Sequence, residues 1–424
     1  MTALSERALK VAEAVSQERL WQRHEDLARF GATAKGGVNR QALSAEETEA
    51  RRYLLDVAAA RGFEAFTDAA GNFFLRLPGA DPGLPPVMTG SHIDSQPTGG
   101  RFDGIFGVLA GLEVLEAIRD VGWTPPRSID VVGWMNEEGS RYAPGMMGSE
   151  TFTGVRDLDE ILTIRDKNGI RVCDALKAVN DALPPLPERP LRRALAAYVE
   201  AHIEQGPVLE QRNIEIGRVT GIQGKQTYRV TVIGEEAHAG TKPMAERRDA
   251  LIAALSMVQT LHKLCSATDP AVMFTVGRFE VAPNAPSVVP ARVDFSIDLR
   301  HPDTDLMRRL GGQFATICAE AAGPCTVELA PLVDTPSMTF DSGIGARITA
   351  AAGALGHSVM DLPSAAGHDA RHLAGHAPSG MIFIPCRGGI SHHESEWSEP
   401  AQVAAGARVL AAVLADLANG VAAP

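Results

Sequence analysis

One loop constrains the fold more than any other stretch of the chain: residues 91–107, which read SHIDSQPTGGRFDGIFG. The apolar run before it, at 86–90, has the character of a buried strand, and the residues from Val108 onward follow a helical pattern. In an open α/β sheet, a loop that joins a strand to a helix lies over the carboxyl edge of the strands, where ligands bind. A histidine and two aspartates in a glycine-rich loop favour a metal site, and the alternative is a polar turn whose aspartate caps the next helix.

Length and charge narrow the general class of the protein. The chain has 424 residues, of which 45% are hydrophobic, so it can bury a sizeable core and suggests two or three domains. Its formal net charge of -12 and pI near 5.5 disfavour nucleic-acid and anionic-membrane partners, because both favour basic patches. We therefore expect a small-molecule ligand.

The cysteines and the apolar runs bear on the compartment. Five cysteines are scattered without a CxxC pair, so neither a disulfide framework nor a thiolate zinc site is indicated. The first thirty residues alternate charged and apolar positions, and no apolar run approaches membrane-spanning length. We expect a cytoplasmic protein in a reducing environment, without a membrane partner.

Helices and strands alternate up to residue 211. A helical spacing covers residues 4–30, and a second helix runs to Ala60 with Ser44 as its cap and Glu47 completing a capping box. The second of these helices is followed by two strands that form a hairpin or a close pair, and later by apolar runs suited to interior strands. The strands are expected at 63–67, 72–77, 128–135 and 197–204.

The organisation changes near residue 212. The next segments read as strands at 214–219, 227–233, 271–279 and 292–299 and near Val327, with helices at 249–264 and 303–321. This order predicts a small α+β insertion, which we place at 212–330, inside an α/β domain formed by 1–211 and 331–424. The α/β pattern then resumes with a helix at 342–355, a strand at 381–384 and a helix at 399–418.

Further polar side chains follow other expected strands. Glu137 and Glu138 come directly after the strand at 128–135, His202 ends the strand at 197–204, and His392 follows a glycine-rich turn. Taken singly, adjacent carboxylates usually mark a solvated turn, and a lone histidine is most often structural. Together at one sheet edge, one carboxylate could bind a metal while the other faces the attacking water, which is the division of labour that hydrolysis needs.

Seven short motifs are spread over nearly the whole chain: GSHID at 90–94, GGRFDG at 99–104, NEEG at 136–139, HIEQGP at 202–207, AHAG at 237–240, GHDA at 367–370 and GISH at 389–392. In this combination the chain resembles the amidohydrolases of the M20 metallopeptidase-like superfamily. HIEQGP separates one branch from ordinary peptidases, the branch of N-carbamoyl-L-amino acid hydrolases, β-ureidopropionases and allantoate amidohydrolases.

The resemblance implies an α/β catalytic domain with a mixed sheet and two metal ions, and an inserted ferredoxin-like domain that acts as lid and dimer contact. His92 and His202 would bind one ion, Glu138 and His392 would bind the second, and Asp103 would bridge them. Zinc, manganese, nickel and cobalt all suit such mixed histidine and carboxylate ligands.

The resemblance also assigns roles around the metals. Glu137 would be the base that takes a proton from water and returns it to the leaving nitrogen. Asp94, two residues from His92, is expected to accept the other imidazole N–H, with a loop cap as the alternative. In related enzymes the counterpart of His238 reaches an active site across a dimer interface. This implies a homodimer joined through 212–330, in which His238 donates to the developing oxyanion.

Substrate recognition is expected at Arg300, which could bind a carboxylate through two parallel hydrogen bonds, or could be a surface ion-pair residue. The family pattern has such an arginine here and an asparagine thirteen residues earlier, where this chain has Ser287. Ala365 replaces a family glycine near the expected pocket, so it adds a methyl group there. Gln205 would supply an amide to the substrate or, alternatively, cap a helix.

These features predict a metal-dependent hydrolase of a linear C–N bond. The expected substrate is an N-carbamoyl L-amino acid or β-amino acid, which would give the free amine, CO2 and ammonia. Allantoate or another ureido acid is the nearest alternative, and an aminoacylase or dipeptidase would have different chemistry. A metal-dependent binding protein is disfavoured, because a binding site does not require a base such as Glu137.

Overall fold

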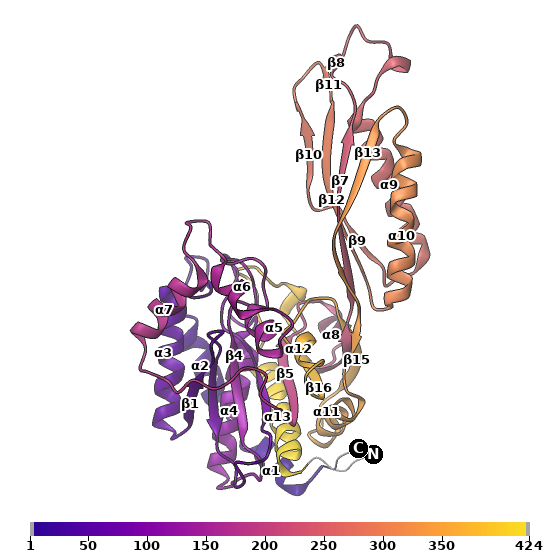
Figure 1. The fold of residues 1–424 in the computed structure, drawn as a ribbon. Coiled ribbons are helices and arrows are strands. Elements are labelled where there is room, and N and C mark those ends of the chain that lie inside the picture. The colour runs from indigo at the N-terminus through magenta and orange to yellow at the C-terminus, as the bar shows by residue number, and fades with distance from the viewer. Residues whose placement is uncertain (1–3, 421–424) are drawn as a thin grey trace. The chain divides into compact units, whose positions relative to one another are not determined.

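The computed structural model describes residues 4–420 and divides the chain into two compact units (Figure 1). The first unit runs to Thr220 and resumes at Phe340, and the second is Gly221–Thr339. Both limits of the second unit lie later in the chain than the expected boundaries at 212 and 330. The reason is that the strand at 216–222 begins as part of the first sheet, while the strand at 326–335 continues the second sheet past residue 330.

A nine-stranded mixed sheet forms the centre of the first unit. The strands lie in the order β1, β2, β4, β3, β5, β16, β6 and β14, and β15 also pairs with β6. Their bounds are β1 (Glu64–Thr67), β2 (Phe73–Leu77), β3 (Val87–His92), β4 (Ile129–Trp134), β5 (Ala197–Ile203), β6 (Ile216–Ile222), β14 (Met338–Thr339), β15 (Val359–Ser364) and β16 (Ser379–Ile384). The expected α/β class with a mixed sheet is confirmed.

Four central strands are parallel, and this positions the site. β3 pairs in parallel with both β4 and β5, and β5 pairs in parallel with β16. The outer pairs β1–β2, β2–β4 and β6–β16 are antiparallel. The carboxyl ends of β4, β3, β5 and β16 therefore meet at one edge of the sheet, and the loops that follow them are brought together there.

The helices of the first unit differ from expectation at three places. The helical stretch at 4–30 is two helices, because the Ser16 hydroxyl accepts from the Arg19 amide and starts a new one. Ser44 caps the third helix as predicted, but the Glu47 carboxylate accepts from the Leu43 amide. Helices at 147–182 were not anticipated. The bounds are α1 (Glu6–Glu13), α2 (Gln17–Leu27), α3 (Ala45–Ala60), α4 (Ile105–Asp120), α5 (Met147–Thr153), α6 (Leu158–Thr163), α7 (Val172–Ala182), α8 (Val208–Gln211), η2 (Arg387–Gly389), α11 (Ser342–Ala354), α12 (Ala370–Leu373) and α13 (Pro400–Asn419).

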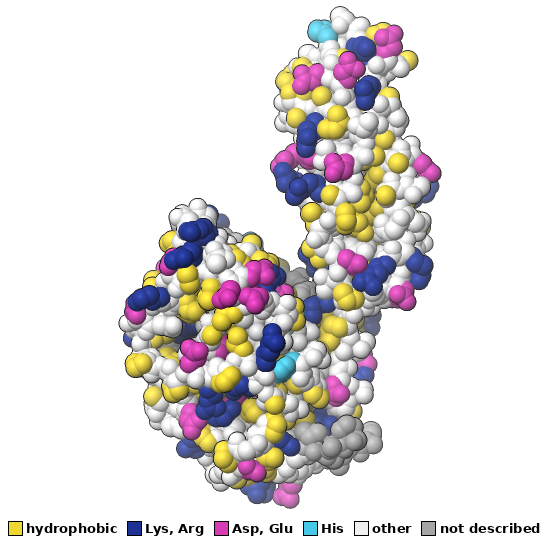
Figure 2. Space-filling model, viewed as in Figure 1, with side chains coloured by type: hydrophobic (Ala, Val, Ile, Leu, Met, Phe, Trp, Pro, Cys, Tyr) yellow, Lys and Arg dark blue, Asp and Glu magenta, His cyan; other side chains and the backbone are white. Residues whose placement is uncertain are grey.

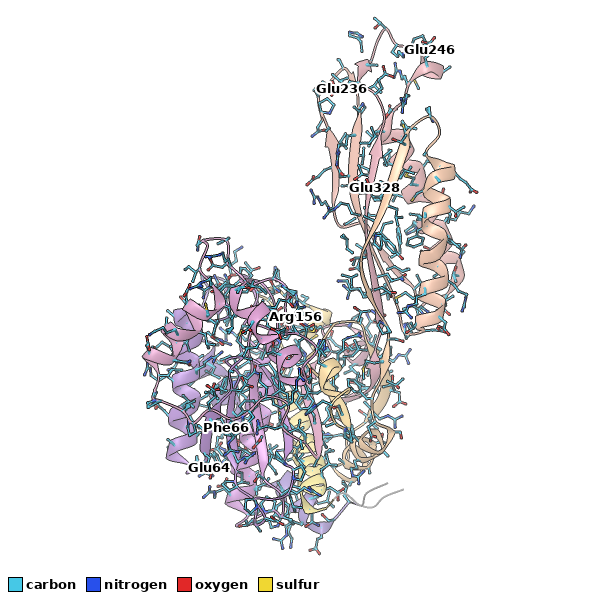
Figure 3. All side chains as sticks on the ribbon, in the orientation of Figure 1. Glu64, Phe66, Arg156, Glu236, Glu246 and Glu328 are labelled. Atoms are coloured by element: carbon cyan, nitrogen blue, oxygen red, sulfur yellow. The ribbon has the colours of Figure 1, made fainter. Side chains whose placement is uncertain are left out.

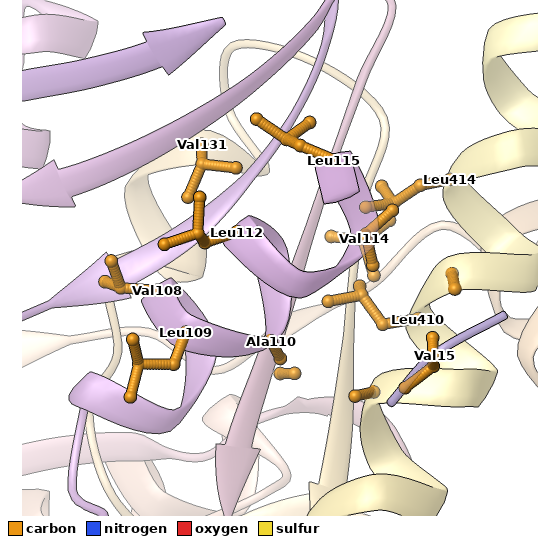
Figure 4. Packing of buried hydrophobic residues seen from close by; sticks show 14 of the residues in the cluster. Val15, Val108, Leu109, Ala110, Leu112, Val114, Leu115, Val131, Leu410 and Leu414 are labelled. Carbon is orange, nitrogen blue, oxygen red and sulfur yellow. The ribbon is translucent and has the colours of Figure 1, made fainter. Parts of the chain in front are cut away.

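The core of the first unit is built around α4 and α13, which pack against each other and against the central strands (Figure 4). Leu112 and Val114 of α4 are completely buried, as are Leu410 and Leu414 of α13. Burying an apolar side chain of this size contributes about 1.5–3 kcal/mol. The helix that follows the 91–107 loop is thus held rigidly, and so is the end of that loop.

The second unit has a five-stranded antiparallel sheet in the order β10, β12, β7, β13, with β9 paired to β12. Along the chain, strands and helices follow the βαββαβ order of a ferredoxin-like fold. The strand expected at 271–279 is interrupted and forms β9 and β10. The bounds are β7 (Gly224–Ile233), β8 (Ala237–His238), η1 (Met244–Glu246), α9 (Ala250–Thr268), β9 (Met273–Thr275), β10 (Phe279–Ala282), β11 (Val288–Val289), β12 (Arg292–His301), α10 (Thr304–Ala321) and β13 (Thr326–Thr335).

Among residues 4–420, two helices, α9 and α13, are long and apolar enough by length and composition to cross a membrane. The prediction that no apolar run approaches membrane-spanning length is therefore wrong. The mean hydropathies of the two helices, 1.3 for α9 and 1.5 for α13, are high enough for a membrane span. In α13, 78% of the apolar window is buried, so this helix is accounted for as a core element. In α9 the figure is 33%, because only one face packs on the sheet of the second unit. Such helices are weak evidence for a membrane span.

Charged side chains of both signs are interspersed over the visible face of each unit (Figure 2). In the second unit, Glu236 and Glu246 lie toward the same end, which also carries the short ribbon of β8 and β11 (Figures 1 and 3).

Candidate metal centre

Side chains from the ends of the four parallel strands meet around Asp103. His92 is the last residue of β3 and His202 the last but one of β5, whereas Glu138 and His392 lie in the loops after β4 and β16. His202 Nε2 is 3.2 Å from Asp103 Oδ1, and His392 Nε2 is 3.3 Å from Asp103 Oδ2. Potential ligand atoms of His92, Asp103 and His202 lie within 4.8 Å of one another, and so do those of Asp103, Glu138 and His392. The structure thus brings the five expected ligands together, with Asp103 common to both groups.

The two buried histidines of this cluster have defined tautomers. His92 Nδ1 is 2.9 Å from the main-chain oxygen of Asp94, and His202 Nδ1 is 2.9 Å from that of Ile203. A carbonyl oxygen can only accept, so each Nδ1 carries the proton and donates it. In the neutral ring each Nε2 then keeps its lone pair, which is the arrangement found in histidines that bind metals.

Asp94 supports the site in a different way from the one expected. Its main-chain carbonyl, and not its carboxylate, accepts from His92; the distance from Oδ1 to the imidazole Nδ1 is 3.7 Å. The carboxylate instead accepts from the amides of Glu137 and Glu138, each at 3.2 Å. A buried carboxylate needs such donors, and the turn after β4 supplies two of them. Asp94 thus fixes the backbone that carries both acidic residues.

The acidic groups of the cluster are crowded in a buried place. Burial, followed by the charge of Asp103, raises the pKa of Glu138 to about 8. Burial and the charges of Asp369 and Glu138 raise the pKa of Glu137 well above its usual value. Glu137 Oε2 also lies 3.4 Å from His92 Nε2. Divalent cations would offset this repulsion, so the donor set fits divalent metal ions.

Gly104 is required for the close approach of the loop to the His92 ring. A Cβ atom at Gly104 would lie 2.3 Å from Cε1 of His92, which is far inside van der Waals contact. The backbone φ of Gly104 is 67°, in the region that favours glycine. The glycine begins α4 as its N-cap residue, so it joins the metal cluster to the most buried helix of the unit.

Three residues support the cluster without having been predicted. Gln96 donates from Nε2 to Glu138 Oε2 at 2.7 Å. Glu396, only 2% exposed, accepts from the Asp103 amide at 3.0 Å, and Ser391 Oγ donates to Asp103 Oδ2 at 3.1 Å. Gln96 lies in the 91–107 loop and Ser391 in the GISH motif, both of which the sequence had singled out. Glu396 belongs to a polar turn with no periodic signal, so nothing in the sequence marked it.

A further group consists of His202, Glu200 and His368, whose potential ligand atoms also lie within 4.8 Å of one another. Glu200 Oε1 accepts from the Ser91 hydroxyl at 2.7 Å, and His368 Nε2 is 3.0 Å from the Ser364 hydroxyl. The His368 ring packs edge-on against the His202 ring with centroids 4.5 Å apart. Because Glu200 and His368 already have partners within the protein, we infer that they hold the His202 ring in place. Ala365, next to Ser364, is exposed.

Gln205 has a contact that the sequence did not indicate. Its Nε2 donates to Asp103 Oδ2 at 2.9 Å and to Ser391 Oγ at 3.1 Å, while its Oε1 is buried and has no hydrogen-bond partner. The alternative role as a helix cap is wrong, because Glu204 accepts from the first amides of α8. A buried acceptor without a donor is costly, by about 1–3 kcal/mol, so Oε1 is suited to a donor from a ligand.

The second unit carries the other three predicted residues, and two of them are neighbours. His238 lies in β8 opposite β11, and the next amide, of Ala239, donates to the Ser287 carbonyl at 2.9 Å. Both His238 and Ser287 are exposed. His238 Nδ1 accepts from the Gly240 amide at 3.0 Å, so the proton of the neutral ring is on Nε2. His238 can thus act as a hydrogen-bond donor through Nε2.

Arg300, the third of these residues, is on β12 and forms a two-pronged pair with Asp298 on the same strand. Its Nε donates to Asp298 Oδ1 at 2.8 Å and its Nη2 to Oδ2 at 3.2 Å. The fork expected for a substrate carboxylate is therefore directed at a carboxylate of the protein itself.

Comparison with known proteins identifies the family. Residues 88–416 match Peptidase family M20/M25/M40. The chain belongs to this family. It is 39% identical over 400 residues to an N-carbamoyl-L-amino-acid amidohydrolase of Rhizobium meliloti, covering 93% of this chain and 95% of that protein. It is 36% identical over 397 residues to an allantoate amidohydrolase of Escherichia coli (strain K12), covering 92% and 96%.

The solved structures agree with these sequence relatives. An amidase of the hydantoinase/carbamoylase family from Burkholderia multivorans superimposes with a TM-score of 0.90 at 40% identity, covering 96% of this chain and 98% of that one. The superfamily and branch expected from the motifs are thereby confirmed.

The close approach at Gly104 gives a test of the cluster. Gly104→Ala should push the His92 ring aside and lower the affinity for divalent metal by about tenfold or more. Gly122→Ala is the matched control, because Gly122 has the same φ of 67° but no atom within 4 Å of an added Cβ. The control should lose about 1 kcal/mol of stability and no metal affinity. Metal affinity is measured by titration of both purified variants. Equal metal affinities of the two variants would contradict the assignment of the cluster as a metal site.

Proposed function

We propose that this protein hydrolyses the linear C–N bond of an N-carbamoyl L-amino acid or β-amino acid with the help of two divalent metal ions. The products would be the free amine, CO2 and ammonia. The observation that carries the proposal is the Asp103 carboxylate shared between two ligand groups, with the Glu137 carboxylate beside them. The relatives that carry amidohydrolase names match this chain over nearly its whole length, which supports the same bond type.

The five ligands divide as the resemblance suggested. His92 and His202 would hold one ion, Glu138 and His392 the other, and Asp103 both. Zinc is the first candidate, with manganese, nickel or cobalt as alternatives that the donor set also accepts. When bound, the ions activate a water and polarise the carbonyl that it attacks.

Glu137 is the base in this scheme. Its carboxylate takes the proton of the attacking water and returns it to the leaving nitrogen, so that the amine departs uncharged. Asp94 keeps Glu137 in place through the backbone amide, so the base is held by the loop that also positions Glu138. The Gln205 Oε1 atom would accept a hydrogen bond from the terminal NH2 of the carbamoyl group, which satisfies its unpaired acceptor.

The second unit would supply recognition and charge stabilisation. Arg300 would bind the substrate carboxylate by two parallel hydrogen bonds. His238, with its proton on Nε2, would donate to the carbonyl oxygen as it becomes negative. Ser287, its neighbour in the β8–β11 ribbon, would contact the substrate through a hydroxyl where the family pattern has an amide.

Allantoate or another ureido acid is the second candidate substrate, favoured by the similarity to the Escherichia coli allantoate amidohydrolase. Ser287 and Ala365 depart from the family pattern in the expected recognition segments, so they bear on the choice. An aminoacylase or dipeptidase activity would need an acyl group where the ureido group is expected. A cytoplasmic location stays a prediction of the sequence.

A substrate panel tests the proposed function. Purified protein with a measured metal content is incubated with N-carbamoyl L-amino acids, N-carbamoyl-β-alanine, allantoate and N-acetyl amino acids. We expect ammonia release from ureido acids, and loss of that activity after chelation. Hydrolysis of the N-acetyl compounds in preference to every ureido acid would contradict the proposal.

Two substitutions separate the base from the metal bridge. Glu137→Gln should keep both metals and lower kcat by about 10²- to 10⁴-fold, because an amide cannot take the proton. Asp103→Ala should lose both metals, since it serves each ion. Metal content and turnover are measured on the same samples. Substantial turnover in Glu137→Gln removes it as the base, and a full metal complement in Asp103→Ala removes Asp103 as the bridge.

We also propose a homodimer joined through the second unit. Ile252 and Leu255 of α9 are 62% and 50% exposed, and Met244, which is 76% exposed, lines the same surface hollow as Ile252. Apolar side chains at these exposures favour a protein contact. In such a dimer His238 would act in the active site of the partner chain.

A mixing experiment tests the role of His238 in the dimer. His238→Ala should be folded and metallated but about 10²- to 10³-fold slower, because one oxyanion donor is lost. Mixing it with Glu137→Gln should restore activity, since a mixed dimer assembles one site from Glu137 of one chain and His238 of the other. No recovery in proven mixed dimers would show that His238 acts within its own chain or not at all.

A further inference from the structure

Strand β12 carries two acid–arginine pairs of nearly the same geometry. Arg300 contacts Asp298 through Nε at 2.8 Å and Nη2 at 3.2 Å. Arg292 contacts Asp294 through Nε at 2.5 Å and Nη2 at 2.8 Å. In each pair the residues are two apart, so both side chains lie on the same face of the strand. The chain therefore contains a built-in comparison for the pair at Arg300.

The two pairs differ in what else binds the carboxylate. Lys225 Nζ lies 3.3 Å from Asp298 Oδ2, and Lys225 is directly opposite Arg300 in the register of β12 and β7. Asp298 thus has two cationic partners. Asp294 instead accepts from the Thr231 hydroxyl at 2.6 Å. If Arg300 left its pair, Lys225 would still compensate the charge of Asp298.

The proposed reaction poses a problem for a carboxylate clamp. Hydrolysis of the carbamoyl group leaves the carboxylate unchanged, so Arg300 would hold the product amino acid as well as the substrate. Binding that is equal in all states lowers KM without raising kcat, and a tight clamp slows product release. A group that competes with the product carboxylate for Arg300 would relieve this.

We propose that Asp298 is this competitor: it takes back the Arg300 guanidinium and so releases the product carboxylate, while Lys225 compensates Asp298 whenever Arg300 is engaged with a ligand. The inference rests on the proposed function of Arg300. Asp298 acts only through Arg300 and is a positioning residue that sets the affinity for carboxylates.

The exposure and charge of the group suit such an exchange. The side chains of Arg300, Asp298 and Lys225 are 31%, 29% and 40% exposed, and ion pairs at this level contribute little stability, so opening the pair costs little. Burial alone would raise the pKa of Asp298, but the hydrogen bond from Arg300 and the charge of Lys225 outweigh it and hold the pKa below its usual value. The competitor is therefore ionised at neutral pH.

The test compares Asp298→Asn with Asp294→Asn. Both amides keep the shape of the side chain and remove its charge. Asp298→Asn should bind the product amino acid about three- to tenfold more tightly, measured as its inhibition constant and by calorimetry, and should lower KM by a similar factor. Where release limits turnover, kcat should fall. Asp294→Asn should leave these constants unchanged, and an N-carbamoyl amine without a carboxylate should not distinguish Asp298→Asn from the parent protein.

A second variant should change the affinity for the product amino acid in the opposite direction. Lys225→Met removes the alternative partner of Asp298, so Asp298 should keep Arg300 more of the time and product binding should weaken about three- to tenfold. A merely structural role of the group would shift both variants in the same direction. Thermal unfolding confirms that each variant is folded, and Lys225→Met alone tests the proposal if Asp298→Asn does not fold.

The outcomes separate this inference from the proposed function. If Arg300→Lys raises KM while Asp298→Asn fails to tighten product binding, the inference is overturned and the role of Arg300 stands. Weaker product binding in Asp298→Asn overturns it too, because Asp298 would then orient Arg300 for the ligand. An unchanged KM in Arg300→Lys overturns both, since a competitor needs a clamp to compete for.

Discussion

The site depends on one carboxylate between two sets of ligands. Asp103 directs Oδ1 toward His202 and Oδ2 toward His392, so its two oxygens face donors from opposite ends of the cluster. Buried carboxylates repel one another unless cations compensate them; burial, followed by the charge of Asp103, raises the pKa of Glu138. The surrounding groups restrain Asp103 further, through donors from Gln205 and Ser391. Two cations that shared the Asp103 carboxylate would compensate the charge that this arrangement concentrates.

The fold provides this arrangement because four neighbouring strands run in parallel. Their loops converge at one edge, which lets residues separated by about three hundred positions meet around Asp103. Backbone carbonyls at residues 94 and 203 set the histidine tautomers, and Gly104 gives the loop room to pass the His92 ring. In the proposed function the second unit would contribute a different kind of chemistry, through the Nε2–H of His238 and through Arg300, which is paired with Asp298.

Much of this could be predicted because the ligands sit in motifs at strand ends, where the apolar pattern changes abruptly. His92 and Glu138 are of this kind. The partner of the His92 N–H could not be derived, because the carbonyl and the carboxylate of Asp94 are equally close in sequence. Glu396 escaped prediction because no periodic pattern marks its turn. The helix at 172–182 does carry a helical pattern, in its buried residues Val172, Ala175, Leu176 and Val179, but no element was predicted there. β9 and β10 merged into one expected strand because only residues 276–278 separate them. The limits of the second unit differ from the expected ones because β6 pairs with β16, which is a tertiary contact that the local sequence pattern does not show.

The number of metal ions per chain tests the shared carboxylate most directly. The protein is stripped with a chelator, reloaded with zinc or manganese, freed of unbound metal and assayed by elemental analysis, together with His202→Ala and His392→Ala. Each variant removes a ligand from one side of Asp103 only. The account predicts two ions per chain in the parent protein and one in each variant, with the remaining ion bound on the unaltered side. A single ion in the parent protein, or two ions retained in both variants, would contradict it.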